Sequence, residues 1–320
     1  MWEALETTKC AAKESLLVQI DQAALCRFVD QLLIEDISPP PWDHRYHFHD
    51  NGVETVAYLL VLDTINFCFW PMPGEPRWEI ESEGQWLSGY YALAACLKKA
   101  VEAGIPITEA RYLSRLSLND LNQLLGGRGR LQLMEERLKN LNELGRILLS
   151  HYDGKAHKLV QAAHNSAVAL ARLLSEKLSS FKDISKYKGR EVLFLKRAQL
   201  FAADLYGAFE GDKWGGFTDM NELTAFADYK LPQVLRKLGI LKYTQQLKQK
   251  VDHEILLEPG GMEEIEIRAN TVWAVELICR ELKRAGKNMN AFQIDNILWN
   301  LGQKDESRTK PYHKVVTIFY

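Results

Sequence analysis

The sequence predicts a mainly α-helical, α+β fold with a small antiparallel β element in its N-terminal third. Apolar residues recur at three- and four-residue steps along most of the chain, as they do in amphipathic helices. Only residues 55–81 are dense in β-branched and aromatic residues and bounded by prolines. The 320 residues are 47% hydrophobic, which is enough for a sizeable core. We therefore expect one compact domain over residues 1–320, with a helix and the β element in residues 1–83 and a mostly helical body in residues 84–320.

The first third of the chain predicts one helix followed by the β element. Residues 15–37 have helical spacing, and residues 39–41 are three prolines that end the helix because proline lacks the backbone donor. Residues 55–70 are rich in Val, Leu, Ile, Phe and Trp, and residues 77–81 alternate Trp and Ile with charged residues. These two segments predict the antiparallel strands.

The rest of the chain predicts helices separated by short turns. Ser117 three residues before Asp120 is a capping-box pattern at a helix start. A glycine cluster at residues 126–129 is interpreted as a turn, with anion binding as the alternative. The predicted helices cover residues 86–103, 108–112, 118–125, 131–151, 165–181 and 192–209, others begin at Met220, Pro232, Glu263 and Ala291, and residues 314–320 are predicted to be extended.

The charge and cysteine content exclude several classes of protein. Lys and Arg number 40 against 42 Asp and Glu, a net charge of −2, so no global field attracts a polyanion. The five cysteines contain no C-x-x-C pair, which disfavours a disulfide framework and a cysteine-built zinc site. No apolar stretch has the roughly 20 residues that span a bilayer, and the start lacks a signal peptide. We expect no membrane partner and a cytoplasmic or nuclear location.

Familiar catalytic motifs are absent. The sequence contains no phosphate-binding P-loop, no G-x-G-x-x-G after a strand, no G-x-S-x-G elbow and no H-E-x-x-H. P-loop nucleotidases, dehydrogenases and serine hydrolases therefore lose support. In residues 43–50, an extended chain would direct His47 and His49 to one face. Zinc needs a third ligand that we do not find, so we predict no metal and expect His49 to face a substrate.

An acid and an amide lie within an otherwise apolar run at residues 62–71. Asp63 and Asn66 precede Phe67 and Trp70 in this run. Such polar groups often satisfy backbone groups of their own segment. The alternative is a pocket for a planar heterocycle, in which Asp63 and Asn66 bind its edge and the aromatic rings stack on it.

A lysine and an aspartate form the third candidate constellation. Lys196 lies in a helical pattern rich in Ala, Leu and Phe, a setting that partly buries it. Asp228 lies just before a helix whose first turn holds Pro232, so the positive helix N-terminus stabilises its carboxylate. Asp228 is thus the expected partner of Lys196, either as a structural salt bridge or as part of a reaction site.

At these residues the chain resembles the queuosine salvage family, whose members are queuosine 5'-phosphate N-glycosylases. The resemblance follows the order of the family's segments through nearly the whole chain. Its most specific segments are residues 63–70, 196–199, 226–229, 231–235 and 265–268, with further ones at residues 86–100, 106–108, 135–137, 165–167 and 313–320.

The resemblance implies a fold and an activity. The implied fold is similar to that of helical DNA glycosylases, which pair a helix-borne Lys with a downstream Asp, here Lys196 and Asp228 as catalytic residues. The implied reaction is hydrolysis of the N-glycosidic bond of queuosine 5'-monophosphate, which releases the 7-deazaguanine base queuine. We find no reliable helix-hairpin-helix glycine loop beside residues 235–241, and this argues against DNA binding.

This reaction suggests a role for each candidate residue. Asp228 stabilises the cationic sugar and accepts a proton from water, and Lys196 orients it or binds phosphate. Asp63 and Asn66 bind the base edge, while Phe67 and Trp70 stack on it. The remaining expected substrate-binding residues, including the cations expected at the 5'-phosphate, are His49, Tyr229, Lys230, His313 and Lys314.

Two other classes of function stay open at this point. One is a nucleic-acid base glycosylase or binding module of the helical DNA glycosylase fold, which the near-neutral charge disfavours. The other is a helical scaffold without enzymatic activity, whose polar runs are buried structural networks. We expect a small-molecule substrate, no cofactor, and no binding of DNA or intact tRNA.

Overall fold

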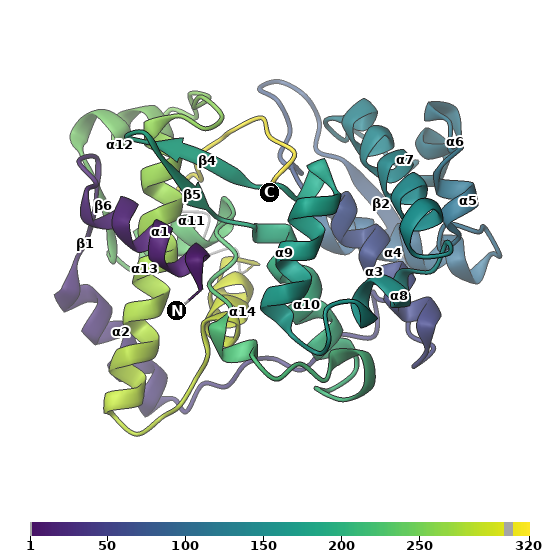
Figure 1. Ribbon diagram of the computed structural model, residues 1–320. Helices are drawn as coiled ribbons and strands as arrows, with labels where there is room; N and C mark the ends of the chain where they lie inside the picture. Colours follow the sequence, from purple (N-terminus) through teal and green to yellow (C-terminus); the bar gives the residue numbers. More distant parts are fainter. Residues whose placement is uncertain (1, 304–309) are drawn as a thin grey trace.

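Helices make up most of the computed structural model, which describes residues 2–303 and 310–320 (Figure 1). This confirms the predicted mainly α-helical class. The helices are α1 (Glu3–Lys13), α2 (Gln22–Ile34), α3 (Val53–Thr64), α4 (Gly89–Glu102), α5 (Ala110–Leu113), α6 (Leu118–Leu124), α7 (Met134–His151), α8 (Ala156–Gln161), α9 (Ala167–Lys177), α10 (Lys196–Ala208), α11 (Lys230–Lys237), α12 (Gln245–Asp252), α13 (Met262–Arg284) and α14 (Ala291–Gln303). The resemblance to helical DNA glycosylases stays a prediction.

The β structure consists of separate hairpin-like pairs. Within the described residues, three two-stranded antiparallel sheets pair β1 with β6, β2 with β3, and β4 with β5. The β2–β3 pair confirms the predicted small antiparallel element in the N-terminal third. The β4–β5 pair lies outside that third, and the β1–β6 pair joins a strand of the first third to one of the C-terminal part. The strands are β1 (Val18–Ile20), β2 (Glu79–Ser82), β3 (Gln85–Ser88), β4 (Ile184–Tyr187), β5 (Arg190–Leu193) and β6 (Leu241–Tyr243).

The predicted strand at residues 55–70 is instead helix α3 followed by an irregular segment. All residues from Thr55 to Thr64 are buried, so this helix has no polar face to produce a helical period. A continuous apolar run does not distinguish a buried strand from a buried helix. The β-branched residues of this run led to the prediction of a strand. Their preference for strands is weak compared with packing in the surrounding core, which here favours a helix.

The start of the helix predicted at residues 15–37 also differs, because a short strand precedes it. The predicted helix at residues 15–37 begins with β1, and α2 starts only after Asp21, whose carboxylate accepts a hydrogen bond from the amide of Ala24 at 2.9 Å. Helix α1 was not predicted. The predicted capping box at Ser117 and Asp120 is confirmed at the start of α6.

Two hydrophobic cores lie side by side. The larger core joins α3, α4, α7, α9 and α10, and the smaller one joins α2, α11, α13 and α14. Helix α1 packs on α13, so the beginning of the chain lies beside its C-terminal part. In Figure 1, α1, α2 and α13 stand on the left and α3, α4 and α7 on the right. The first 83 residues are thus divided between both cores.

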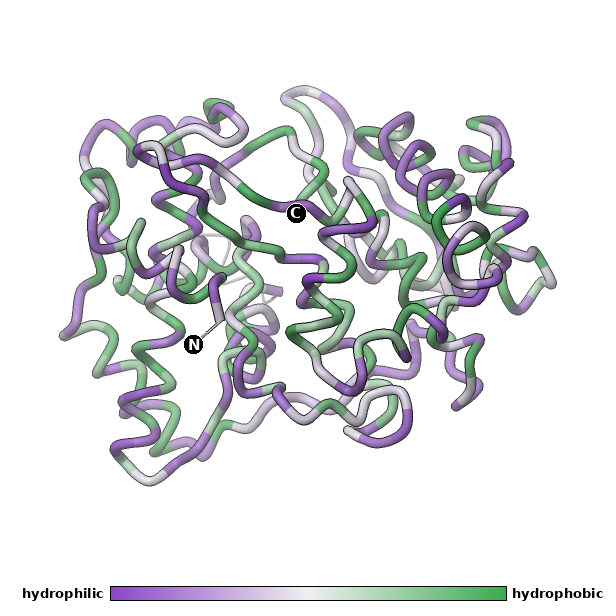
Figure 2. Tube along the Cα trace, viewed as in Figure 1, coloured by the Kyte–Doolittle hydropathy of each residue, from purple (hydrophilic) through white to green (hydrophobic). Residues whose placement is uncertain are grey.

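Hydrophilic and hydrophobic residues alternate along the outer helices, as Figure 2 shows for α5 to α7. This pattern is what one-sided burial requires. Within residues 2–303 and 310–320, no helix has both the length and the apolar character needed to cross a bilayer.

Candidate active site

A cavity of about 700 Å³ lies between the two hydrophobic cores. Helix α10 and residues 66–70 line it from the larger core, and α14 and residues 226–230 line it from the smaller one. The cavity therefore brings together the second and third constellations that the sequence predicted. The predicted site residues that line it are Asn66, Phe67, Trp70, Lys196, Asp228, Tyr229 and Lys230, whereas His49, Asp63, His313 and Lys314 do not.

One face of α10 forms a wall of the cavity. Lys196, Leu200, Ala203, Asp204 and Gly207 line it, and their spacing of four, seven, eight and eleven residues keeps them on one side of a helix. Lys196 is the first residue of α10. Asp204 lies two turns further along, roughly 12 Å along the helix axis.

Asp228 is held by the start of helix α11. Its Oδ1 accepts hydrogen bonds from the backbone amides of Lys230 at 2.7 Å and Leu231 at 3.0 Å. Both amides belong to the first helical turn, where the helix dipole also stabilises a negative charge. No hydrogen bond reaches Asp228 Oδ2 in the described part of the chain. One carboxylate oxygen therefore anchors the residue and leaves the other for a ligand.

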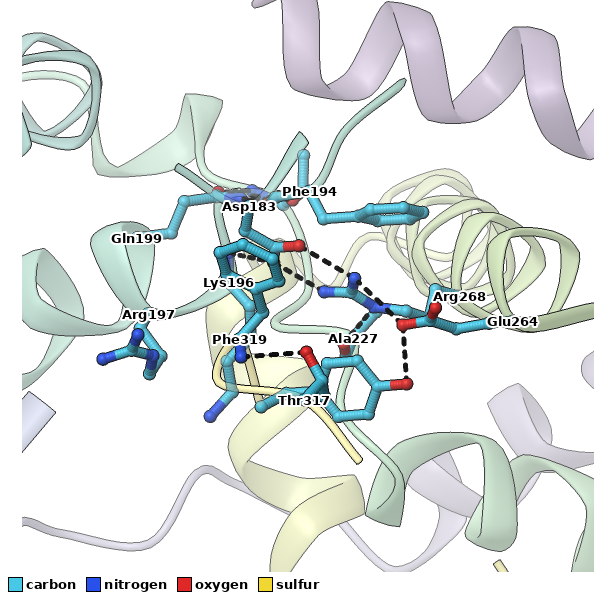
Figure 3. Close-up of polar contacts among 12 residues, drawn as sticks. Asp183, Phe194, Lys196, Arg197, Gln199, Ala227, Glu264, Arg268, Thr317 and Phe319 are labelled. Carbon is cyan, nitrogen blue, oxygen red and sulfur yellow. Dashed lines mark hydrogen bonds and ion pairs between the residues drawn. The ribbon is translucent and has the colours of Figure 1, made fainter. Parts of the chain in front are cut away.

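Arg268 of α13 connects the Lys196 and Asp228 segments (Figure 3). Its Nη1 and Nη2 donate to the two oxygens of Asp183 at 2.9 and 2.6 Å. Asp183 Oδ2 in turn accepts from the backbone amide of Lys196 at 3.1 Å. Arg268 Nε donates to the carbonyl oxygen of Ala227 at 3.0 Å. A single buried guanidinium thus fixes the backbone beside both candidate catalytic residues.

Lys196 and Asp228 do not form a direct ion pair. The Lys196 ammonium has no hydrogen bond or ion pair within 4 Å among the residues that the structure describes, although its side chain is buried. Burial lowers the pKa of Lys196, and the nearby charges of Asp228 and Asp63 partly oppose this effect. The structural salt bridge that the sequence left open is therefore not formed.

Two buried arginines hold the segment between α3 and the cavity. Arg197 donates to the carbonyl oxygens of Asp63 and Thr64, each at 2.6 Å. Arg137 donates through Nη1 to the carbonyl oxygen of Ile65 and through Nη2 to that of Phe67. These bonds satisfy the carbonyl oxygens at and just after the C-terminal end of α3, which have no partner within the helix. They set the direction in which residues 66–70 enter the cavity.

Asp63 supports the cavity wall from behind. It is fully buried, and its Oδ1 accepts a bond of 3.4 Å from the amide of Asn66. Burial raises the pKa of Asp63 to about 7, while the charge of Lys196 opposes the rise. The sequence placed Asp63 at the edge of a bound base, but Asp63 does not line the cavity, whereas its hydrogen-bond partner Asn66 does.

The predicted stacking residues line the cavity but are tightly enclosed. Phe67 is fully buried and lies under the guanidinium groups of Arg137 and Arg197, at 4.3 and 5.0 Å from its ring centroid. Trp70 is 2% exposed and carries the Lys314 ammonium over its ring at 5.5 Å. Phe69 of the same predicted run and Phe226 beside Asp228 also line the cavity. The cavity further contains aromatic side chains that the site prediction did not name: Trp42, Tyr90, Tyr91, Phe292, Trp299, Tyr312 and Tyr320.

The histidine prediction selected the wrong member of its pair. His49 lies against His44 and Phe209 outside the cavity, whereas His47 lines it. The backbone around residues 43–49 forms a turn and no strand, so alternate residues do not share a face. In the described residues, no three His, Cys, Asp or Glu side chains gather in a way that would bind a metal ion.

The predicted phosphate contacts are also revised. His313 is buried beside Tyr320, and burial lowers its pKa to about 3, so it is uncharged at neutral pH. The Lys314 ammonium pairs with Glu254 at 3.2 Å. Besides Lys196, the cations that line the cavity among the described residues are Arg45, Arg77 and Lys230, whose Nζ lies 5.7 Å from the ring centroid of Tyr312. Sequence reasoning missed Arg77 because only the tertiary structure brings it near residues 229–230.

Two buried aspartates of the cavity were also missed. Asp204 and Asp295 line it at 6% and 4% exposure. Asp295 accepts a hydrogen bond from the backbone amide of Phe226 at 2.7 Å, which helps to position the Asp228 loop. The helical spacing from Lys196 contained a signal for Asp204, since eight residues are close to two turns.

Comparisons with known proteins support the family resemblance described from the sequence. The family model described as "Queuosine salvage protein" matches residues 46–320. A protein of Sphaerobacter thermophilus is 42% identical over 316 residues, covering 99% of this chain and 97% of its own length. Proteins of Nematostella vectensis and Bos taurus are 36% and 33% identical, covering 87% and 98% of this chain and 85% and 98% of their own. All three are named queuosine 5'-phosphate N-glycosylase/hydrolase. This chain belongs to the queuosine salvage protein family.

Proposed function

We propose that this protein hydrolyses the N-glycosidic bond of queuosine 5'-phosphate and releases the base queuine. Relatives that cover nearly the whole chain carry this activity in their names. The observation that carries the proposal is the Asp228 carboxylate, which has one oxygen anchored by two backbone amides and the other without a hydrogen bond from the described residues at the wall of the cavity. N-Glycoside cleavage develops positive charge on the sugar, and such an anion stabilises it.

Asp228 has two roles in succession: electrostatic stabilisation of the sugar and then proton transfer. As the bond to the base lengthens, its unbonded Oδ2 stabilises the cationic sugar ring. The same oxygen then accepts a proton from the water that attacks the anomeric carbon. Cleavage adds the elements of water across the bond: hydroxyl to the sugar and hydrogen to the base. Lys196, buried nearby, adds a positive charge to this part of the cavity.

The leaving base is recognised at its hydrogen-bonding edges. A 7-deazaguanine has no N7 to protonate, so hydrogen bonds to its other polar atoms must support its departure. Asn66 lines the cavity and supplies such a group. Asp63 accepts a hydrogen bond from Asn66 Nδ2 at 3.4 Å, and this contact orients the Asn66 amide so that its oxygen faces the cavity.

The 5'-phosphate lies near Arg77, Lys230 and Tyr312. Lys230 follows Asp228 by two residues, so a phosphate at this position places the sugar beside the carboxylate. Burial raises the pKa of Tyr312, and the charge of Arg77 opposes this rise, which indicates that the two groups are close. Arg77 is exposed and Lys230 half-buried, and both can therefore reach a charged group at the mouth of the cavity.

The substrate is a free mononucleotide, and we expect no cleavage of DNA or intact tRNA. A strong polynucleotide binder commonly makes about six to ten phosphate contacts, while this chain has a net charge of −2. One terminal phosphate needs only two or three donors.

The five cysteines are free in the structure, which supports a reducing compartment, and we place the reaction in the cytoplasm or nucleus.

The test compares three substrates in parallel. The full chain is incubated with queuosine, its 5'-phosphate and queuosine-containing tRNA, and free queuine is measured by chromatography. We expect the phosphate to raise kcat/KM about tenfold or more over queuosine, the effect of one or two charged hydrogen bonds. Arg77→Gln should reduce that advantage. Release of queuine from tRNA at the rate of the mononucleotide would contradict the proposed substrate class.

A further inference from the structure

The far end of the α10 wall holds a buried carboxylate within a group of aromatic rings. Asp204 lies about two helical turns from Lys196. Tyr90 contacts it from α4, and Trp299 of α14 packs edge-on against Tyr90 with ring centroids 5.8 Å apart. Trp42 lies against Gly207, one turn beyond Asp204: a Cβ added at Gly207 would lie 2.7 Å from its ring. The proposed reaction does not use this group.

Asp204 lacks a firm hydrogen-bond donor. The Tyr90 hydroxyl lies 3.3 Å from Asp204 Oδ2 and 2.8 Å from His47 Nε2. His47 Nδ1 lies 2.6 Å from the carbonyl oxygen of Asp43, to which it must donate, and burial lowers the pKa of His47 to about 4. Nε2 of the neutral ring is therefore an acceptor, and it takes the single Tyr90 proton at the shorter distance.

The buried part of the cavity also carries an excess of acids. Among the described lining residues that are buried, Asp204, Asp228 and Asp295 face one cation, Lys196. Burial raises the pKa of Asp204 well above its ordinary value, and the charge of Asp63 adds to the rise while Lys196 opposes it. These surroundings favour the neutral form of the Asp204 carboxyl group. A bound cation would favour its ionised form.

Given the proposed function, on which this inference rests, we propose that Asp204, Tyr90 and Trp299 form a subsite for the ammonium group on the arm of the base. In queuine the cyclopentenediol is attached to the 7-deazaguanine through an aminomethyl group, which is a secondary amine and protonated at neutral pH. Asp204 supplies its counter-ion. The faces of Tyr90 and Trp299 add cation–π attraction, which is strongest in a desolvated site.

The position of this subsite relative to Lys196 and Asp228 fits a substrate that extends along α10. The sugar lies beside Lys196 and Asp228, so the base extends along α10 toward Asp204. The phosphate, which is negative, lies at Arg77 and Lys230. Opposite charges of the substrate thus meet opposite charges of the protein at the two ends of the cavity, and this arrangement favours one orientation of the substrate.

The experiment measures base binding, which does not depend on turnover. Calorimetry compares 7-aminomethyl-7-deazaguanine with 7-hydroxymethyl-7-deazaguanine, which has the same shape without the charge. We expect the full chain to bind the amine at least about tenfold more tightly, as for one charge-assisted hydrogen bond. Asp204→Asn should reduce that ratio to about one. Asp295→Asn, the matched control, should retain it, because Asp295 is already bonded to the Phe226 amide.

Three results would overturn the subsite. One is a ratio near one in the unaltered protein, and another is an unchanged ratio in Asp204→Asn. The third is that Asp204→Asn slows cleavage of 7-deazaguanosine 5'-phosphate, which has no arm, as much as it slows cleavage of queuosine 5'-phosphate, because Asp204 would then serve the bond-breaking step. Absence of turnover with queuosine 5'-phosphate beside a retained amine preference would contradict the proposed function alone.

Discussion

Two buried groups of charged residues lie next to each other and differ in how they are paired. Around Arg268, every guanidinium nitrogen has an acceptor: both oxygens of Asp183 and the carbonyl of Ala227. In the cavity, the Lys196 ammonium has no partner within 4 Å among the described residues, and Asp204 has only a long contact to Tyr90. Both groups are equally buried.

The difference teaches which buried charges are structural and which serve a ligand. A fully paired cluster stabilises one arrangement of the backbone, and removing one partner leaves the other as an uncompensated charge. An unpaired cluster destabilises the empty protein and is compensated when a ligand binds. Substitutions in the first group should therefore change stability, and substitutions in the second should change activity.

The largest effect is expected for Arg268→Met. It leaves Asp183 buried without its partner, and we expect the free energy of unfolding to fall by about 3 to 5 kcal/mol. Urea unfolding measures this change. The double variant Asp183→Asn, Arg268→Met should cost less than the sum of the single substitutions, because no charge is left unpaired. A loss below about 1 kcal/mol in Arg268→Met would show that the paired group is not structural.

Asp228→Asn should have the next largest effect, and on activity alone. The amide oxygen still accepts from the amides of Lys230 and Leu231, so the helix start is preserved. It cannot stabilise the cationic sugar or accept a proton, and we expect turnover of queuosine 5'-phosphate to fall at least about 100-fold. Single-turnover queuine release is the measurement. Near-normal turnover in a protein with unchanged unfolding would assign the chemistry to another group.

Lys196→Met should lower turnover about tenfold or more while stability is kept or increased. Methionine preserves the packing of the lysine stem, and the substitution removes a buried ammonium that has no direct partner. Thermal unfolding and kcat are compared in the same preparations. If the melting temperature instead falls sharply and the folded fraction stays active, Lys196 belongs with the structural group.

Asp63→Asn should give the smallest effect, visible as a change in pH dependence. Because the folded protein raises the pKa of Asp63 to about 7, it binds a proton that the unfolded chain releases near pH 4. Stability from this group is therefore complete below about pH 4 and is lost as the pH rises to 7. Asparagine carries no such cost, and we expect the variant to gain stability relative to the unaltered protein as the pH rises from 5 to 8.

Urea unfolding at pH 5 and pH 8 measures this difference. The amide oxygen of asparagine still accepts from Asn66, so the comparison isolates the ionisation. Equal stability of the two proteins at both pH values would mean that Asp63 stays ionised when buried.

Some of the site could be predicted because its signal is local. Asp228 before Pro232 predicts a carboxylate at a helix start, and the amides of Lys230 and Leu231 bind it there. Lys196 follows from helical spacing in the same way. For Asn66, Phe67 and Trp70, the mixture of polar and aromatic residues in one run correctly predicted a place at a cavity wall.

Other predictions failed where distant segments decide the outcome. The apolar run of α3 contains no period that separates a buried helix from a strand. Asp63 and Asp204 both lie in largely apolar helical runs, yet only Asp204 lines the cavity, on the same face of α10 as Lys196. The hydrogen-bond partners of Arg268, Asp183 and Ala227, are 85 and 41 residues away, so its own segment shows only the ion pair with Glu264 one turn earlier.

The sequence by itself therefore determined the helical class and the family, and it proposed Lys196 and Asp228 as catalytic candidates, since these inferences depend on spacing and on residues near one another in the chain. The tertiary structure decided which acids face the cavity, which cations lie at its mouth and which charges are paired. The physical reason is that burial and pairing depend on atoms from both cores at once. A charged side chain has the same chemistry everywhere, and the neighbours that the fold supplies determine whether it stabilises the protein or binds a ligand.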